Sequence, residues 1–202
     1  YLYYELMMDA GLPSGVLNIL AGYGEEAGDA LVRHPRIRFV GFTGSKEVGK
    51  LVYERAAQVA PGQIWLKRVI TEMGGKNAAI VDEGTDIEYA VNEIAFAAYG
   101  YQGQKCSCTS RVIAVGSTYD AVLECLVERT KQVDVGPARE NRFMGPLINQ
   151  AALDKVLSYI ELGKQEARLA YGGRRLSEGV FAEGYYVDPT VFADVLPQAR
   201  IA

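Results

Sequence analysis

Short apolar runs of strand length alternate with amphipathic segments of helix length along the first half of the chain. The pattern predicts strands at residues 16–20, 37–42, 67–71 and 78–81, and helices at 25–32 and 46–59. Strands that alternate with helices are typical of βαβ units. We therefore predict an α/β fold with a largely parallel sheet.

The pattern changes after residue 85, where longer helical segments are separated by loops rich in glycine. Helices are predicted at residues 86–99, 119–131 and 151–167, with strands at 111–115 and on both sides of Asp188-Pro189. Glycines punctuate a loop at 100–108, and Gly136-Pro137 and Gly145-Pro146 mark a long polar loop. A domain boundary is predicted near residues 72–76.

The two ends of the chain resemble positions inside a longer protein. Residues 1–10 look like the second half of a helix that Gly11 and Pro13 end, and no helix start signal precedes them. The chain stops soon after a strand-like segment at 190–193. We expect an internal segment; a complete small protein with trimmed ends is the alternative.

Composition and charge exclude several classes of protein. The chain has 202 residues, 49% of them apolar, and its 21 basic and 25 acidic residues give a net charge of −4. The basic residues are scattered, which argues against binding to nucleic acid or to an anionic membrane surface. No apolar run approaches the roughly 18 residues of a membrane-spanning helix, so we expect a soluble protein.

Cysteine and histidine usage narrows the chemistry further. The three cysteines, Cys106, Cys108 and Cys125, suit a reducing compartment, and we expect a cytoplasmic protein, or a mitochondrial matrix protein in a eukaryote. The single histidine, His34, lies beside Pro35 in a polar connector. A Cys-His protease, a Ser-His hydrolase or a multi-histidine zinc site would each have to recruit it.

Two glycine-containing turns could bind phosphate groups. The segment from Gly22 to Gly28 resembles a dinucleotide fingerprint, but two acidic residues follow the turn, and a simple βα turn is the favoured reading. The turn Phe42-Thr-Gly-Ser45 presents backbone N–H groups and a hydroxyl at a predicted helix start. Ser45 could equally be no more than the cap of that helix.

Cys106 and Glu72 are the candidates for catalysis. Cys106 lies in a polar, glycine-containing loop beside Lys105, a setting that exposes a thiol as a nucleophile requires, whereas a buried structural cysteine is the usual alternative. A metal site at Cys106 and Cys108 would lack further ligands at suitable spacing. Glu72 ends a predicted strand and could act as a general base at the edge of the sheet.

Three motifs in a fixed order resemble the aldehyde dehydrogenase superfamily. They are Phe42-Thr-Gly-Ser45 with Gly49, Glu72-Met-Gly-Gly-Lys76, and Gly103-Gln-Lys-Cys106. The spacing of 34 residues between glutamate and cysteine is the one that the family keeps, and residues 11–16 and 184–192 extend the resemblance over the chain. Residues 61–68 and 99–107 are similar to the branch that oxidises L-glutamate γ-semialdehyde.

The resemblance implies a role for each matching residue. Cys106 would be the nucleophile and Glu72 the base that activates water, while Ser107 would contact the amino acid end of the substrate. NAD, with NADP as the alternative, would bind at the following residues: Gly22, Gly44, Ser45, Val48, Gly49 and Met73. Residues 1–72 would be the C-terminal part of the NAD-binding domain, and residues 73–202 the major part of the catalytic domain.

The resemblance also implies that some site residues lie outside the chain. The family's oxyanion asparagine and ribose-binding lysine would precede residue 1, and the glutamate facing the nicotinamide ribose and the loop anchoring the substrate carboxylate would follow residue 202. We therefore expect the 202 residues alone to be inactive and the full-length enzyme to be a homo-oligomer. There are three alternatives: a CoA-acylating relative, an enzyme for a different aldehyde, and an inactive scaffold. Glu72 argues against the CoA-acylating relative, and Cys106 together with Glu72 argues against the scaffold.

Overall fold

The computed structural model describes residues 1–202, which form two compact units, residues 1–74 and 75–202. The division between Gly74 and Gly75 lies within the segment 72–76. No helix in either unit is both long and apolar enough to cross a membrane.

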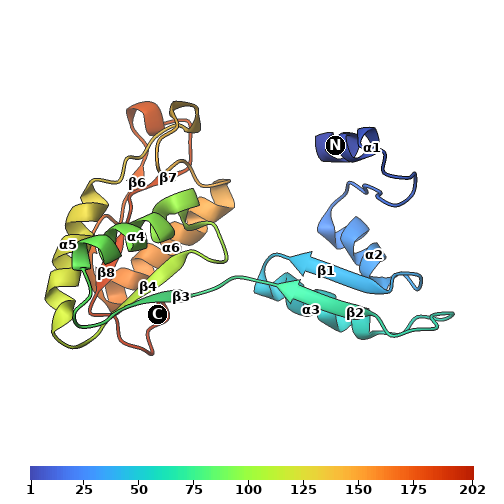
Figure 1. Cartoon of the computed structure of the whole chain (residues 1–202), viewed down its shortest axis with the longest axis horizontal. Coiled ribbons are helices and arrows are strands. Elements are labelled where there is room, and N and C mark those ends of the chain that lie inside the picture. Colours follow the sequence, from blue (N-terminus) through green and yellow to red (C-terminus); the bar gives the residue numbers. More distant parts are fainter. The chain divides into compact units, whose positions relative to one another are not determined.

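The first unit contains one βαβ element. In chain order its elements are α1 (Leu2–Asp9), a turn of π-helix η1 (Gly24–Gly28), α2 (Asp29–Arg33), β1 (Phe39–Thr43), α3 (Lys46–Ala57) and β2 (Arg68–Glu72). Strands β1 and β2 are parallel neighbours, with Phe39 opposite Arg68 and Thr43 opposite Glu72, and α3 connects them (Figure 1). The predicted strand–helix–strand order is therefore confirmed here.

One predicted strand of the first unit is wrong. Residues 16–20 form no strand, and Val16 and Leu20 remain 66% and 63% exposed. A strand needs a neighbour for its backbone hydrogen bonds and a surface that buries its side chains. No strand of the first unit pairs with this segment, so its apolar composition alone does not produce a strand.

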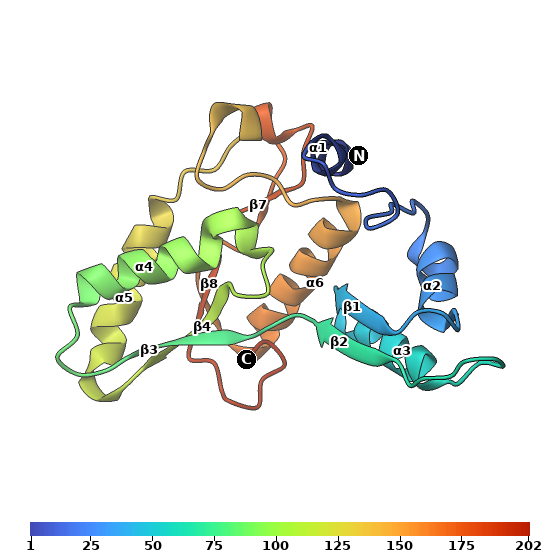
Figure 2. The same ribbon diagram turned by 45° about the vertical axis from the view of Figure 1, so that its right-hand side comes forward.

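The second unit begins with a parallel strand pair covered by helices. Strand β3 (Asn77–Val81) pairs with β4 (Thr109–Ala114), and α4 (Ile87–Tyr99) lies between them in the chain, followed by the 3₁₀ turn η2 (Gly100–Gly103). Helix α5 (Tyr119–Lys131) follows η3 (Gly116–Thr118) and lies beside α4 (Figures 1 and 2). Val81, Val91, Ile94 and Val122 form the core between them.

The rest of the second unit adds one long helix and short antiparallel pairs. After η4 (Ala138–Glu140) come α6 (Gln150–Glu166), β5 (Arg168–Tyr171), β6 (Arg175–Leu176), η5 (Gly179–Phe181), β7 (Tyr186–Val187) and β8 (Val191–Ala193). Strand β5 pairs with β8 and β6 pairs with β7. The helices and the two strands around Asp188-Pro189 are confirmed, whereas β5 and β6 were not predicted because such short strands carry little periodic signal.

Candidate active site

The carboxyl edge of β1 and β2 brings two of the sequence motifs together. Thr43 and Glu72 are register partners at the strand ends, and the Gly44 amide donates a hydrogen bond to the Glu72 carbonyl at 3.0 Å. The motif that starts at Phe42 therefore lies beside the motif that starts at Glu72. Ligands of parallel α/β sheets commonly bind at this edge.

Ser45 is the N-cap of α3. Its hydroxyl oxygen accepts a hydrogen bond from the Val48 amide at 3.2 Å. The capping alternative from the sequence is therefore confirmed, and it does not conflict with phosphate binding at the same helix end. The exposed Lys46 adds positive charge to the partial positive charge of the helix N-terminus.

The glycines of this edge leave space for neighbouring side chains of the first unit. A Cβ atom on the buried Gly49 would lie 2.7 Å from the Met73 sulfur, and one on Gly44 would lie 2.5 Å from the Phe42 ring. Gly49 and Met73 are thus in direct contact at the sheet edge. A side chain at position 49 would displace the Met73 side chain from this position.

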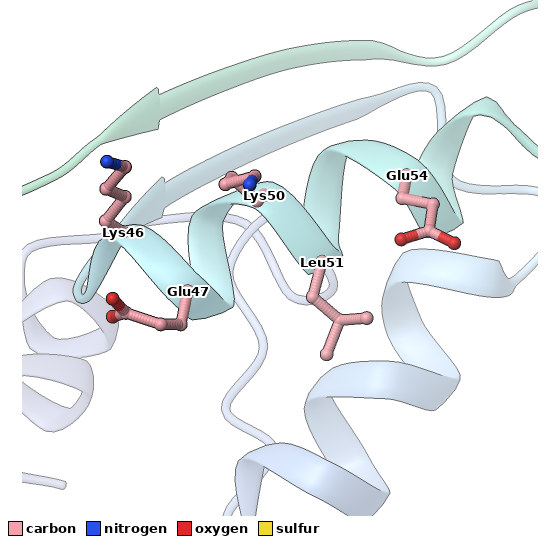
Figure 3. Close-up of a pocket in the computed structure, with 5 residues that line it drawn as sticks. All are labelled: Lys46, Glu47, Lys50, Leu51 and Glu54. Atoms are coloured by element: carbon pink, nitrogen blue, oxygen red, sulfur yellow. The ribbon is translucent and has the colours of Figure 1, made fainter.

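A shallow hollow runs along the exposed side of α3. Figure 3 shows its lining residues, Lys46, Glu47, Lys50, Leu51 and Glu54. Val48, on the same helix, is 45% exposed. The helix start offers backbone N–H groups and Lys46 to a pyrophosphate, while Glu47 in the same turn opposes part of that positive charge. Val48 and Leu51 expose apolar surface that an adenine ring could contact, so the helix can accommodate a dinucleotide.

Gly22 lacks the local structure that the fingerprint needs. No strand precedes it, and a Cβ atom there would lie 2.7 Å from the Ala27 Cβ atom. Glu25 and Glu26 occupy the first turn of η1, where they disfavour a phosphate. The assignment of Gly22 to the cofactor site stays a prediction from the resemblance alone.

Glu72 is the last residue of β2 and is exposed. Because two glycines follow Met73, the backbone leaves the strand without a helix that would cover the Glu72 carboxylate. A solvent-accessible carboxylate at a strand end can accept a proton from water, as the sequence predicted for a general base.

Cys106 differs from the other two cysteines in its exposure. All three thiols are free, but only Cys106 is exposed, whereas Cys108 is 6% exposed and Cys125 packs against the core of α4 and α5. The Cys108 sulfur lies 3.7 Å from the Gly100 carbonyl. Cys106 is therefore the thiol that can reach a substrate, and Ser107 beside it is also exposed.

The loop before Cys106 has an unusual backbone. Tyr101, Gln102 and Gly103 all have positive φ angles, of 59°, 56° and 67°. This conformation costs about 1–2 kcal/mol for each residue other than glycine. The residue that follows this segment has a tertiary contact: the Gln104 side-chain oxygen accepts a hydrogen bond from the Ile148 amide at 3.0 Å.

Two residues near the start of β3 contact the Cys106 loop and were missed by the sequence analysis. The Asn77 side-chain nitrogen donates to the carbonyls of Cys106 at 2.7 Å and of Cys108 at 3.2 Å. A Cβ atom on Gly75 would lie 2.5 Å from the Cys106 carbonyl oxygen. The pattern around residue 75 shows a turn before a strand, but it does not indicate which loop the strand meets.

Lys76 lies beside these residues in a partly desolvated position. Its ammonium group donates to the Ile201 carbonyl at 3.0 Å, and its own carbonyl accepts from Arg111 at 2.9 Å. Burial, followed by repulsion from the Arg111 guanidinium, lowers the pKa of Lys76. No group of three or more histidine, cysteine or acidic side chains in the two units is arranged to hold a metal ion.

The predicted site residues divide between the two units. Gly44, Ser45, Val48, Gly49, Glu72 and Met73 lie in the first unit, at the carboxyl edge of β1 and β2 or on α3. Cys106 and Ser107 lie in the second unit, just before β4. The segment from Met73 to Lys76 connects the carboxyl end of β2 to the amino end of β3.

An exposed cysteine thiol, a glutamate at a strand end and a capped helix start are the features of the predicted site that the structure shows. A model of the aldehyde dehydrogenase family matches residues 1–202, and the chain belongs to this family.

Several similar proteins within the family carry the same name. The chain is 56% identical over 202 residues to a 1-pyrroline-5-carboxylate dehydrogenase of Geobacillus thermodenitrificans, and 50% identical over 200 residues to that of Bacillus subtilis. These matches cover 100% and 98% of this chain and 38% of each relative. A Thermus 1-pyrroline-5-carboxylate dehydrogenase structure with bound NAD has 52% identity and a TM-score of 0.94, covering 98% of this chain and 38% of that one.

Proposed function

We propose that the complete protein containing this chain oxidises L-glutamate γ-semialdehyde to L-glutamate with NAD. The exposed Cys106 thiol, in a chain of the aldehyde dehydrogenase family, is the observation that carries the proposal. The substrate is inferred from relatives with 50–56% identity that are named 1-pyrroline-5-carboxylate dehydrogenase. The chain spans 38% of the length of these relatives, so the activity is assigned to the complete protein.

The first chemical step uses Cys106. Its thiolate sulfur attacks the aldehyde carbon and forms a thiohemiacetal, with the negative charge on the former carbonyl oxygen. NAD, held by residues at the start of α3, would supply the hydride acceptor for this carbon. Loss of the hydride restores the carbonyl, so the acyl group is left as a thioester on Cys106.

The second chemical step uses Glu72. Its carboxylate takes a proton from a water molecule, and the resulting hydroxide attacks the thioester carbonyl. The carbon–sulfur bond then breaks, which releases L-glutamate and regenerates the Cys106 thiolate. The exposure of Glu72 at the end of β2 supports this role, because the base must reach water.

The remaining residues are assigned to binding. Gly44, Ser45, Val48, Gly49 and Met73 would hold the cofactor, which the capped N-terminus of α3 and its contact with Met73 support. The assignment of Gly22 to the cofactor site is supported only by the resemblance to the family. Ser107 would donate a hydrogen bond to the amino acid end of the substrate.

Domain roles, assembly and location are part of the same proposal. Residues 1–72 would belong to the cofactor-binding domain and residues 73–202 to the catalytic domain. We also propose a homo-oligomer in the cytoplasm; the three free cysteines suit a reducing compartment. Native mass spectrometry of the complete protein would show the assembly, and a single copy would reject the homo-oligomer.

Substrate preference tests the proposal directly. We expect kcat/KM to be at least 100-fold higher for L-glutamate γ-semialdehyde than for pentanal, because pentanal would leave polar groups of the site without partners. NADH formation followed at 340 nm measures both values. Equal kcat/KM values would reject L-glutamate γ-semialdehyde as the preferred substrate but would agree with aldehyde oxidation. If no aldehyde gave NADH, aldehyde oxidation itself would be rejected.

A further inference from the structure

The amide nitrogen of the Asn77 side chain donates two hydrogen bonds to the loop that carries Cys106. Asn77 is the first residue of β3, and its amide nitrogen lies 2.7 Å from the Cys106 carbonyl oxygen and 3.2 Å from the Cys108 carbonyl oxygen. A primary amide has two N–H donors, so each carbonyl can receive one. The opposite orientation would place the amide oxygen against two carbonyl oxygens.

The two carbonyls lie in the turn that presents the nucleophile. The Cys108 amide donates to the Lys105 carbonyl at 3.2 Å, which closes the turn around Cys106. Regular pairing between β3 and β4 begins at Asn77 and Thr109, and its register shifts directly afterwards. The turn therefore lies just outside the regular strand pairing, and the Asn77 side chain supplies hydrogen bonds that fix it to β3.

Gly75 makes room for the same carbonyl. A Cβ atom there would lie 2.5 Å from the Cys106 oxygen, a distance that real Cβ atoms essentially never show. The contacting atom belongs to the backbone, so the loop would have to move as a whole. Gly75 and Asn77 thus act on the same atom, the Cys106 carbonyl oxygen. Gly75 leaves space for it, and Asn77 donates a hydrogen bond to it.

We propose that Asn77 is a positioning residue for the Cys106 nucleophile, with Gly75 providing the space that this position requires. The inference rests on the proposed function and deepens it. Asn77 binds only the backbone of the loop, so it acts on the reaction through the location of the Cys106 sulfur. Without its two hydrogen bonds the turn can shift, and the sulfur reaches its attacking position less often.

The test uses Asn77→Ala and Asn77→Asp in the complete protein. Asn92→Ala is the matched control, because the Asn92 oxygen accepts a hydrogen bond from Arg129 at 2.8 Å between α4 and α5, away from the loop. The measured quantity is the rate constant of the first turnover, with enzyme in excess over L-glutamate γ-semialdehyde and saturating NAD. We expect this constant to fall about 10- to 100-fold in Asn77→Ala.

Asn77→Asp has nearly the same shape but faces both carbonyls with a carboxylate, so we expect a fall at least as large. Asn92→Ala should stay within about twofold of the parent. Because enzyme is in excess, the amount of aldehyde sets the amplitude, and a partial loss of folded protein leaves the rate constant unchanged as long as the folded enzyme stays saturating. Repeating the measurement at twice the enzyme concentration checks that saturation. A rate constant for Asn77→Ala within about twofold of the parent would overturn the proposal.

A double-mutant cycle tests whether Gly75 and Asn77 act through the same carbonyl. Gly75→Ala should also slow the first turnover. The fold-decrease of the rate constant in the double variant should be smaller than the product of the fold-decreases in the two single variants. Fully multiplicative losses would overturn the shared role.

Hydrogen exchange tests the positioning without any need for activity. The Cys108 amide should exchange about tenfold faster in Asn77→Ala than in Asn92→Ala, because the turn that protects it opens more often. Equal exchange would overturn the positioning role. A parent enzyme that oxidises no aldehyde would instead reject the proposed function, while the exchange result would still decide the role of Asn77.

Discussion

Replacement of Cys106 or Cys108 by alanine should separate chemistry from stability. The two residues lie two positions apart, but Cys106 is exposed and Cys108 is only 6% exposed. Cys106→Ala removes the proposed nucleophile and little buried surface. We expect no measurable aldehyde oxidation, and a change in unfolding free energy within about 0.5 kcal/mol.

Cys108→Ala should have the opposite effect. The substitution removes one buried sulfur atom, comparable to the loss of one buried methylene, and also its weak contact with the Gly100 carbonyl at 3.7 Å. We expect a loss of about 1–2 kcal/mol of unfolding free energy. Because the Cys108 side chain does not reach the reacting atoms, activity per folded molecule should stay within about threefold of the parent.

Urea unfolding and NADH formation, measured on the same preparations of the complete protein, provide both quantities. Cys125→Ala serves as a second control, since its thiol packs against the core of α4 and α5. If Cys108→Ala lost activity per folded molecule as completely as Cys106→Ala, the assignment of the nucleophile from exposure would be refuted.

Three further predictions concern other parts of the chain. Glu72→Gln should form one NADH per site in a rapid burst and then turn over slowly, because acylation needs no base at this position; steady turnover at the parental rate in a stopped-flow record would exclude Glu72 as the deacylating base. Ser45→Ala should lower the unfolding free energy by about 1 kcal/mol through loss of the cap on the Val48 amide, and Ser45→Thr should retain most of it; urea melts in which alanine matches the parent would contradict the cap. Burial raises the pKa of Tyr99 to about 12, so its contribution to stability should be intact below pH 10 and decline as the pH rises to 12, by at most about 3 kcal/mol. The difference in unfolding free energy between the parent and Tyr99→Phe should therefore shrink over this range, and a constant difference would be inconsistent with the raised pKa.

Long amphipathic helices were the features that the sequence predicted best. Helix α5 spans residues 119–131 as expected, α4 begins one residue later than predicted, and α6 begins and ends one residue earlier than predicted. The starts of α4 and α6 are marked by capping residues: the Asp86 carboxylate accepts from the Tyr89 amide at 3.1 Å, and the Asn149 side chain accepts from the Ala152 amide at 2.9 Å. Such signals lie within a few residues of the element that they define.

Strands depended on partners that the local pattern does not reveal. Residues 16–20 are as apolar as β3 but have no neighbouring strand, so they stay exposed. Strand β5 forms because β8 pairs with it from more than twenty residues further along the chain. Pairing over such distances is decided by the packed structure, not by the composition of either segment.

The candidate site shows the same difference between local and distant information. The exposure of Cys106 and the position of Glu72 at a strand end followed from the residues around them. The contact between Asn77 and the Cys106 carbonyl joins residues 29 positions apart, and it exists only because β3 pairs with β4. Asparagine at the start of a strand has no sequence signal that would have indicated this role.

The covalent state of Cys106 during turnover tests the central proposal most directly. Glu72→Gln in the complete protein is mixed with NAD and L-glutamate γ-semialdehyde, quenched in acid within seconds, and analysed by intact mass and peptide mass spectrometry. We predict one glutamyl thioester per chain, located on Cys106 and absent when NAD is omitted. An acyl group on Cys108 or Cys125, or NADH formation without any adduct on Cys106, would contradict the proposed mechanism.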